Sequence, residues 1–112
     1  MVGIDVLEID RMADALARTP GLRDRLFTPG EQQYADAQSV PARHYAARFC
    51  AKEAVAKALQ LTAWDATEIE VVVAASGAPE ITLHGRLAAQ PQVAVSLTHT
   101  RGTAAAVAMV RP

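Results

Sequence analysis

The chain of 112 residues has one cysteine, five aromatic residues and no long hydrophobic run. The single cysteine, Cys50, excludes an internal disulfide bond and a zinc site built from several thiolates. No window of about 18 residues is apolar throughout, and acidic residues at Asp5 and Glu8 interrupt the N-terminus. The sequence therefore predicts neither a membrane span nor a signal peptide. A lone thiol in an apolar segment suits a reducing compartment, so we expect the cytoplasm.

The chain also lacks an excess of charge of either sign. Eleven Lys and Arg residues stand against twelve Asp and Glu residues, which gives a formal net charge of −1, and no stretch carries five or more like charges. Nucleic-acid-binding domains typically carry a basic patch, so this composition argues against that class of partner. With 51% apolar and 21% charged residues, residues 1–112 are predicted to form a single globular domain.

Alanine is the residue that the chain has in excess, with 24 copies, and it favours close packing of helices. Surface scaling predicts a folded accessible area of roughly 6,000 Å², with about 65% of the unfolded surface buried. A core of that size gives modest stability unless subunits share surface.

The first half of the chain predicts one strand followed by helices. Val2 to Ile9 alternates in the manner of a strand, and Asp10 is expected to cap a helix over residues 11–19. Residues 22–27 predict one or two helical turns. Thr28 and Glu31 form a capping box with Pro29 at the first helical position, which predicts a helix through residue 38.

Pro41 begins the longest helical pattern, which continues to residue 61 without an internal glycine or proline. After Trp64 the pattern predicts two hairpins, over residues 68–85 and 93–110. The fold class is therefore α+β: an N-terminal strand, helices including one long central helix, then an antiparallel β-meander.

Asp5 is the first candidate functional residue, because it interrupts an apolar strand between Ile4 and Val6. Buried carboxylates persist only when they are paired. Asp5 is either a strand-end carboxylate that caps a neighbouring loop or a metal ligand.

Glu53 is the second candidate, and it lies four residues before Lys57 on the long helix. The pair is either an ordinary surface ion pair of the i, i+4 type or part of a site. Together with Asp5 and the cations Arg48, Lys52 and Lys57, Glu53 gives the oxygen-rich and cation-rich setting that Mg²⁺ and a pyrophosphate require.

Three histidines and the cysteine are weighed separately. His99 ends a strand just before the turn at Arg101 and Gly102, where a side chain can project over a cleft. His44 and His84 have no evident partners in the sequence and are interpreted as structural residues. Cys50 has no neighbouring base and is interpreted as a small core residue.

Five segments in order carry a family resemblance. They are GIDVLEIDR, FTPGE, RFCAKEAVAKAL, EIEVVVAASGAP and VSLTHTRGTAAAVAMV. Together they resemble the holo-acyl-carrier-protein synthase type of 4′-phosphopantetheinyl transferase over nearly the whole chain. The resemblance implies transfer of the phosphopantetheine arm of coenzyme A to a serine of an acyl or peptidyl carrier protein, with release of adenosine 3′,5′-bisphosphate.

The resemblance also implies roles for particular residues. Asp5 and Glu53 match the ligands that hold Mg²⁺ against the pyrophosphate of the coenzyme, and Glu53 is also the nearest plausible base for the serine. Lys57 and His99 match phosphate-binding positions, with Lys57 close to the reacting groups. Arg48 and Lys52 flank the same site by helical spacing, so we expect them to reach phosphates.

Partners follow from the same resemblance. Arg11, Arg18 and Arg25 match the basic surface that the family presents to its acidic carrier protein, although a solvated helix face would have the same spacing. Family members are trimers with the coenzyme lodged between subunits, so a homotrimer is expected. It would also compensate for the small core.

One segment departs from the family pattern. Members usually follow the central helix with a Gly-Thr-Gly turn, whereas residues 59–64 read Leu-Gln-Leu-Thr-Ala-Trp. Without glycine, we expect the backbone to avoid positive φ there, and coenzyme contacts in this loop to differ. The alternative function is therefore a non-catalytic module that binds carrier protein with the same fold. An unrelated α+β interaction domain is a third possibility.

Overall fold

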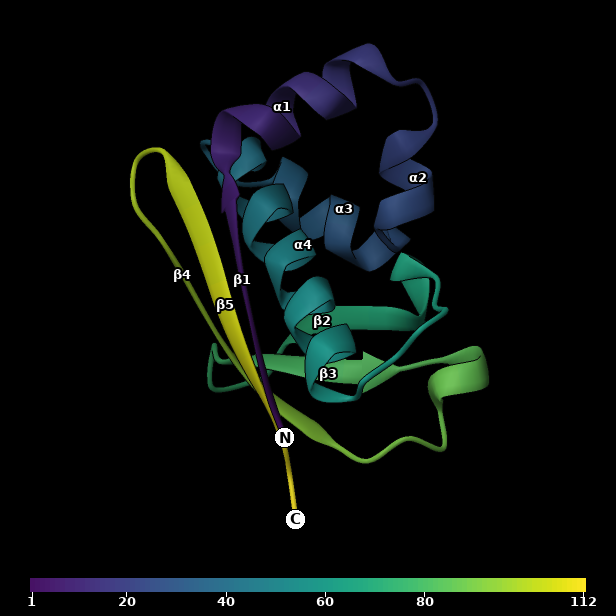
Figure 1. Cartoon of the computed structure of the whole chain (residues 1–112). Helices are drawn as coiled ribbons and strands as arrows, with labels where there is room; N and C mark the ends of the chain where they lie inside the picture. Colours follow the sequence, from purple (N-terminus) through teal and green to yellow (C-terminus); the bar gives the residue numbers. More distant parts are fainter.

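In the computed structural model of residues 1–112, the first strand pairs with the last one. Strand β1 (Val2–Glu8) runs antiparallel to β5 (Thr103–Val110), and β5 runs antiparallel to β4 (Val93–His99), so the sheet order is β1-β5-β4. Val2 lies opposite Met109, which brings the two ends of the chain together, as Figure 1 shows. The strand that carries Asp5 is thus fixed by residues from the far end of the sequence.

The other two strands form a sheet of their own. Strand β2 (Ile69–Val73) pairs antiparallel with β3 (Pro79–Leu83). The α+β class is confirmed, but the four later strands make two hairpins in separate sheets rather than one continuous meander. The connection over residues 84–92, which contains the short 3-10 helix η2 (Gly85–Leu87), is longer than the roughly 2–5 residues of a hairpin loop.

Four helices lie between β1 and β2. They are α1 (Ile9–Arg18), α2 (Leu22–Leu26), α3 (Pro29–Asp36) and α4 (Pro41–Ala58). The capping box of α3 is confirmed: the Thr28 hydroxyl accepts the Glu31 N–H at 3.2 Å, and a Glu31 carboxylate oxygen accepts the Thr28 N–H at 2.9 Å. The Asp10 cap is wrong, because α1 begins at Ile9 with Glu8 at the N-cap position, and Asp10 lies in the first turn. An acidic residue there still interacts favourably with the helix dipole.

Helix α4 is the centre of the molecule, and Figure 1 shows it between the three-stranded sheet and the other helices. Eleven of its 18 residues are buried. It packs very closely on β1, because a β-carbon added to Gly3 would clash with the Ala54 carbonyl oxygen and lie 2.8 Å from the Ala58 nitrogen. The sequence predicted close packing of helices from the abundant alanines. The close contact seen here is between a helix and a strand, and small side chains allow it.

The end of α4 differs from the sequence expectation in both its position and its conformation. The helix ends at Ala58, and Gln60 adopts φ +57°, so the backbone does use positive φ without a glycine. The Leu61 N–H donates to the Ala56 carbonyl at 2.9 Å and the Gln60 N–H donates to the Lys57 carbonyl at 3.1 Å. These two bonds make a Schellman motif, in which Gln60 occupies the position that usually holds glycine.

One face of the three-stranded sheet is apolar and uncovered by the chain itself. We call it the outer sheet face, and it consists of Val2, Ile4, Val6, Val107 and Met109. The three β1 residues are 60–63% exposed. The total accessible surface is 6416 Å², close to the expectation for a folded chain of this length. No helix of the chain is both long enough and apolar enough to cross a membrane.

Candidate functional site

Asp5 and Lys57 meet where β1 passes α4. The Lys57 ammonium nitrogen lies 3.3 Å from an Asp5 carboxylate oxygen, and it donates to the Ile4 carbonyl at 2.9 Å. The side chain of Asp5 is 21% exposed and that of Lys57 is 55% exposed, so both remain reachable from solvent. The sequence placed these residues 52 positions apart, and the packing of α4 on β1 brings them together.

Glu53 belongs to the same group, because it precedes Lys57 by one helical turn. Burial raises the pKa of Glu53, the neighbouring Asp5 carboxylate raises it further, and Lys57 opposes both. Two carboxylates and one ammonium group therefore share this part of the surface. We call Asp5, Glu53 and Lys57 the carboxylate pair site.

The donor set of this site fits a hard divalent cation such as Mg²⁺. No group of three or more His, Cys, Asp or Glu side chains gathers in the chain, so the protein offers two carboxylates rather than a full cage. Mg²⁺ is usually bound in that way, through one or two carboxylates with water and substrate phosphate at its other positions. Burial is the main reason why the pKa of Glu53 is raised, and the second reason is the Asp5 carboxylate, a repulsion that a bound cation would reduce.

Lys52 is not at the carboxylate pair site, and the expectation that it reaches phosphates is wrong. Its side chain is 0% exposed. The ammonium nitrogen donates to a Glu31 carboxylate oxygen at 2.7 Å, to the Ala66 carbonyl at 2.7 Å and to the Ile69 carbonyl at 2.6 Å. These three acceptors require three donors, so Lys52 is charged and has no hydrogen left for a ligand, although burial lowers its pKa.

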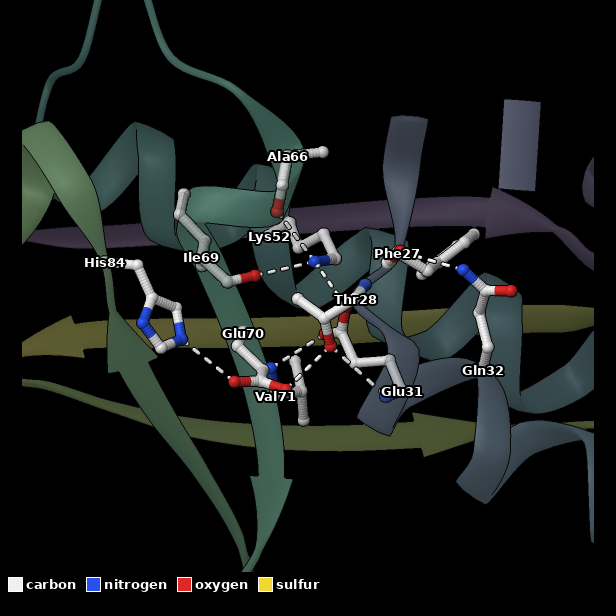
Figure 2. Close-up of polar contacts among 10 residues, drawn as sticks. All are labelled: Phe27, Thr28, Glu31, Gln32, Lys52, Ala66, Ile69, Glu70, Val71 and His84. Carbon is white, nitrogen blue, oxygen red and sulfur yellow. Dashed lines mark hydrogen bonds and ion pairs between the residues drawn. The ribbon is translucent and has the colours of Figure 1, made fainter. Parts of the chain in front are cut away.

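Figure 2 shows how this buried pair continues into a network. The second carboxylate oxygen of Glu31 accepts the Val71 N–H at 2.8 Å. The Thr28 hydroxyl donates to Glu70 at 2.6 Å, and the other Glu70 oxygen lies 2.9 Å from His84 Nε2. Lys52, Glu31 and their partners therefore tie α4 to α3 and to the start of β2. The interpretation of His84 as a structural residue agrees with its place in this network.

Arg48 lies one turn before Lys52, on the same side of α4. Its guanidinium carbon is 4.1 Å from the centre of the Tyr34 ring, which is a cation–π contact with α3. Arg48 is only 5% exposed, and its Nε is buried without a hydrogen-bond partner. It faces away from the carboxylate pair site, because Arg48 and Lys52 contact α3 whereas Glu53 and Lys57 face β1.

His99 ends β4 opposite Ala104 of β5. Its ring is exposed, and Nδ1 lies 3.3 Å from the Thr100 carbonyl oxygen. The nearest ring is that of His44 on α4, with centroids 6.1 Å apart. His44 was interpreted from the sequence as a structural residue without partners, and no local pattern reveals this contact. The carboxylate pair site and the separate contact between His99 and His44 thus replace the single site that helical spacing suggested.

The three arginines assigned to a carrier protein are all exposed. Arg11 and Arg18 lie on α1, two turns apart, whereas Arg25 lies on the separate helix α2 beyond the turn at residues 19–21. The interval of seven residues therefore does not continue on one helix. Cys50 is fully buried with its sulfur 3.6 Å from the Ala104 carbonyl oxygen, and burial raises its pKa to about 12, which agrees with a core role.

Comparison with known proteins decides the family. The model of the 4′-phosphopantetheinyl transferase superfamily matches residues 1–109. The chain belongs to this superfamily. The resemblance carried by the five sequence segments is therefore confirmed.

Relatives of similar length share sequence with this transferase along almost its whole length. It is 44% identical over 115 residues to a holo-[acyl-carrier-protein] synthase of Frankia alni, covering 95% of the chain and 92% of the relative. It is 42% identical over 118 residues to one of Moorella thermoacetica, covering 96% and 91%.

Solved structures of such synthases are also similar to this transferase. One from Helicobacter pylori, in complex with coenzyme A, has a TM-score of 0.85 at 26% identity and covers 99% of this chain and 100% of its own. One from Mycobacterium tuberculosis has a TM-score of 0.77 at 40% identity and covers 98% and 95%. The α+β arrangement described above is thus that of known synthases.

The buried pair generates the first prediction. Lys52→Met leaves the Glu31 carboxylate buried without its cation, so we expect the free energy of unfolding to fall by about 3–5 kcal/mol. Chemical denaturation measures this loss. The folded fraction should still bind coenzyme A with unchanged affinity.

Lys57→Met is the matched control for stability, since an exposed lysine on the same helix should cost less than about 1 kcal/mol. An equal and small loss in both variants would show that the Lys52 pair does not stabilise the fold.

Proposed function

We propose that this transferase moves 4′-phosphopantetheine from coenzyme A to a serine hydroxyl of an apo acyl or peptidyl carrier protein and releases adenosine 3′,5′-bisphosphate. The observation that carries the proposal is the meeting of Asp5, Glu53 and Lys57 between β1 and α4. Its relatives named as holo-[acyl-carrier-protein] synthases support the same reaction.

The reaction is a displacement at phosphorus. The serine oxygen forms a bond to the phosphorus that carries the pantetheine arm, and the bond from that phosphorus to the bridging oxygen breaks. The bridging oxygen leaves with the adenosine bisphosphate, and the proton of the serine hydroxyl passes to a base. Such transfer needs positioning and neutralisation of charge more than covalent work by the protein.

Glu53 is the base that we propose. Its carboxylate lies one helical turn before Lys57 and near Asp5, so it is an available acceptor for the serine proton at this site. Lys57 follows it by one helical turn, and we propose that its ammonium group, 3.3 Å from Asp5, neutralises charge on the leaving phosphate. The positions of these two side chains one turn apart on α4 keep the base and the cation together.

Asp5 and Glu53 are the side chains that would hold Mg²⁺, which supplies charge neutralisation to the pyrophosphate when bound. In the free chain the Lys57 ammonium lies 3.3 Å from the Asp5 carboxylate. His99 and Arg48 are proposed to bind other phosphate oxygens of the coenzyme. Lys52 is left out of this set because all its donors are occupied.

A homotrimer is the proposed assembly. The outer sheet face exposes five large apolar side chains that nothing in the chain covers. Continuous apolar surface of this kind typically marks an interface between subunits. The phosphate-binding residues His99 and Arg48 and the carboxylate pair site occupy different parts of one subunit, which favours a coenzyme shared between neighbours.

The carrier protein is proposed to dock on α1 and α2. Arg11 borders an apolar hollow of about 180 Å³ that is lined by Leu22, Leu26 and Phe49 among others. A basic rim beside an apolar hollow suits an acidic, amphipathic helix of the partner. Arg18 on α1 and Arg25 on α2 are also exposed and add positive charge to these two helices. A cytoplasmic location completes the proposal. Carrier proteins and coenzyme A are available there, and its reducing conditions suit the free thiol of Cys50.

The alternative function is a module that binds carrier protein without catalysis. Mass spectrometry of apo carrier proteins incubated with the chain, coenzyme A and Mg²⁺ separates the two. A transferase adds the mass of phosphopantetheine, whereas a binding module leaves the carrier protein unchanged.

Asp5→Asn and Glu53→Gln should each lower turnover by on the order of 10² or more, because each removes a metal-binding charge. Glu53→Gln should also raise the melting temperature of the metal-free chain. The raised pKa means that ionised Glu53 destabilises the fold at neutral pH; this penalty shrinks as pH falls through the raised pKa and is gone below the ordinary pKa of a carboxyl group. Near-normal turnover of either variant at saturating Mg²⁺ would refute the metal assignment.

The trimer can be tested by sedimentation at micromolar concentration. Ile4→Lys places a charge on the outer sheet face, so we expect trimer affinity to fall by on the order of 10². Val73→Lys changes a valine that is also exposed but lies on β2, and it should remain trimeric. A wild-type chain that sediments as a fully active monomer would contradict the proposed assembly.

Charge reversal tests the docking surface. Arg11→Glu should raise the KM for carrier protein roughly tenfold at low ionic strength and leave the KM for coenzyme A unchanged, because it affects encounter with an acidic partner. Arg111→Glu, which also reverses an arginine but does not line the hollow beside Arg11, is the control. Equal KM values for carrier protein in wild type and Arg11→Glu would place the docking surface elsewhere.

A further inference from the structure

His44 lies between three elements of the fold. It belongs to the first turn of α4, and its ring packs edge-on against Tyr34 of α3, with centroids 5.7 Å apart. On its other side the ring faces His99 at the end of β4, with centroids 6.1 Å apart. Residues 34, 44 and 99 thus form one contiguous group that only the tertiary structure assembles.

The surroundings of His44 are cationic. Arg43 and Arg48 of its own helix carry the nearby positive charges, the titratable His99 of β4 faces it, and the facing group from α3 is the Tyr34 phenol. No carboxylate is among the groups that shift the pKa of His44, and the two carboxylates of α3 have other partners: Glu31 accepts hydrogen bonds from Lys52, Thr28 and Val71, and Asp36 contacts Tyr45 and Arg23. No acidic group is therefore free to balance these cations, and an anion would be held favourably here.

A second observation points to a missing partner. Arg48 is almost fully buried, yet its Nε makes no hydrogen bond. Buried arginine nitrogens are normally satisfied, and an orphaned one marks the place of an acceptor that the chain itself does not supply. Phosphate oxygens are acceptors of the required kind.

The state of His44 in the free chain follows from the same groups. Burial lowers its pKa, and the neighbouring Arg48, His99 and Arg43 lower it further. His44 is therefore neutral at neutral pH, with one N–H donor. A phosphate dianion placed beside the ring would reverse the sign of the local charge and favour the doubly protonated ring.

We propose that His44 is a phosphate-binding residue that takes up a proton when a phosphate group of coenzyme A binds beside it and His99. The inference rests on the proposed function, since it concerns the same coenzyme. It makes coenzyme binding proton-linked: affinity rises as pH falls from about 8 towards 6, and levels off below about 6, where a phosphomonoester itself takes up a proton.

The test measures proton uptake directly by titration calorimetry of coenzyme A into the full chain, in two buffers that differ in ionisation enthalpy. Wild type should take up as much as about one proton per site at pH 7. His44→Gln should take up markedly less. Its Kd should be weakened about tenfold at pH 6 and little at pH 8, as expected for the loss of one charge-assisted hydrogen bond.

Two further variants make the result specific. His44→Phe keeps ring packing on Tyr34 and His99 while removing both ring nitrogens. It should show the same reduced proton uptake as His44→Gln, and it replaces that variant in the test if the glutamine variant is unstable. His84→Gln removes a histidine that pairs with Glu70 in another part of the molecule, and its proton uptake should equal that of wild type.

Coenzyme A and dephospho-coenzyme A identify which phosphate is involved. Uptake that persists with the dephospho form assigns the pyrophosphate, and uptake that disappears assigns the phosphomonoester; either result supports a phosphate ligand for His44. Proton uptake by His44→Phe equal to that of wild type would overturn this inference alone. Failure of the wild type to bind coenzyme A at any pH would overturn the proposed function as well.

Discussion

The buried ion pair between Lys52 and Glu31 holds together the parts of the molecule on which everything else depends. One ammonium group satisfies a carboxylate on α3 and two carbonyl groups at the start of the second sheet, all at 2.6–2.7 Å. Taking these charges out of water is costly, and only the completeness of the hydrogen bonding offsets that cost. Because α4 cannot rotate without breaking the pair, the direction of its other faces is fixed too.

The fixed orientation of α4 explains why adjacent residues have unrelated roles. Lys52 faces the interior, and the next residue, Glu53, faces β1. The successive side chains of a helix point about 100° apart, so a buried anchor and an active carboxylate can be neighbours in sequence without being neighbours in space. The close contact at Gly3 then sets the distance between Asp5 and the helix.

The candidate site lies on a well-packed helix but includes locally unfavourable features. Glu53 lies close to Asp5, and its raised pKa records the repulsion and burial that the fold tolerates there. Gln60 accepts a backbone conformation that suits glycine at the end of the same helix. The buried network at Lys52 fixes α4 just before both of these residues. Unfavourable local features persist in proteins where the surrounding structure determines them strongly, and they often occur beside functional sites.

The sequence by itself determined most of the elements of this protein. Alternation, capping residues and helical period depend on neighbours a few positions away, so the helix over α4, the Thr28 capping box and the paired strands could be predicted. The five ordered segments also predicted the family, and with it Asp5 and Glu53. Local patterns do not contain the partners of a side chain, however.

The tertiary structure alone decided the direction in which each cation points. Lys52 and Lys57 are both lysines on one helix, yet the first is buried in an ion pair and the second is half exposed beside Asp5. His44 gained partners from α3 and β4 that lie 10 and 55 positions away in the sequence. Such contacts arise from the packing of α4 against both sheets and α3. This packing brings together side chains that are far apart in the sequence, so their spacing along the chain does not reveal the contact.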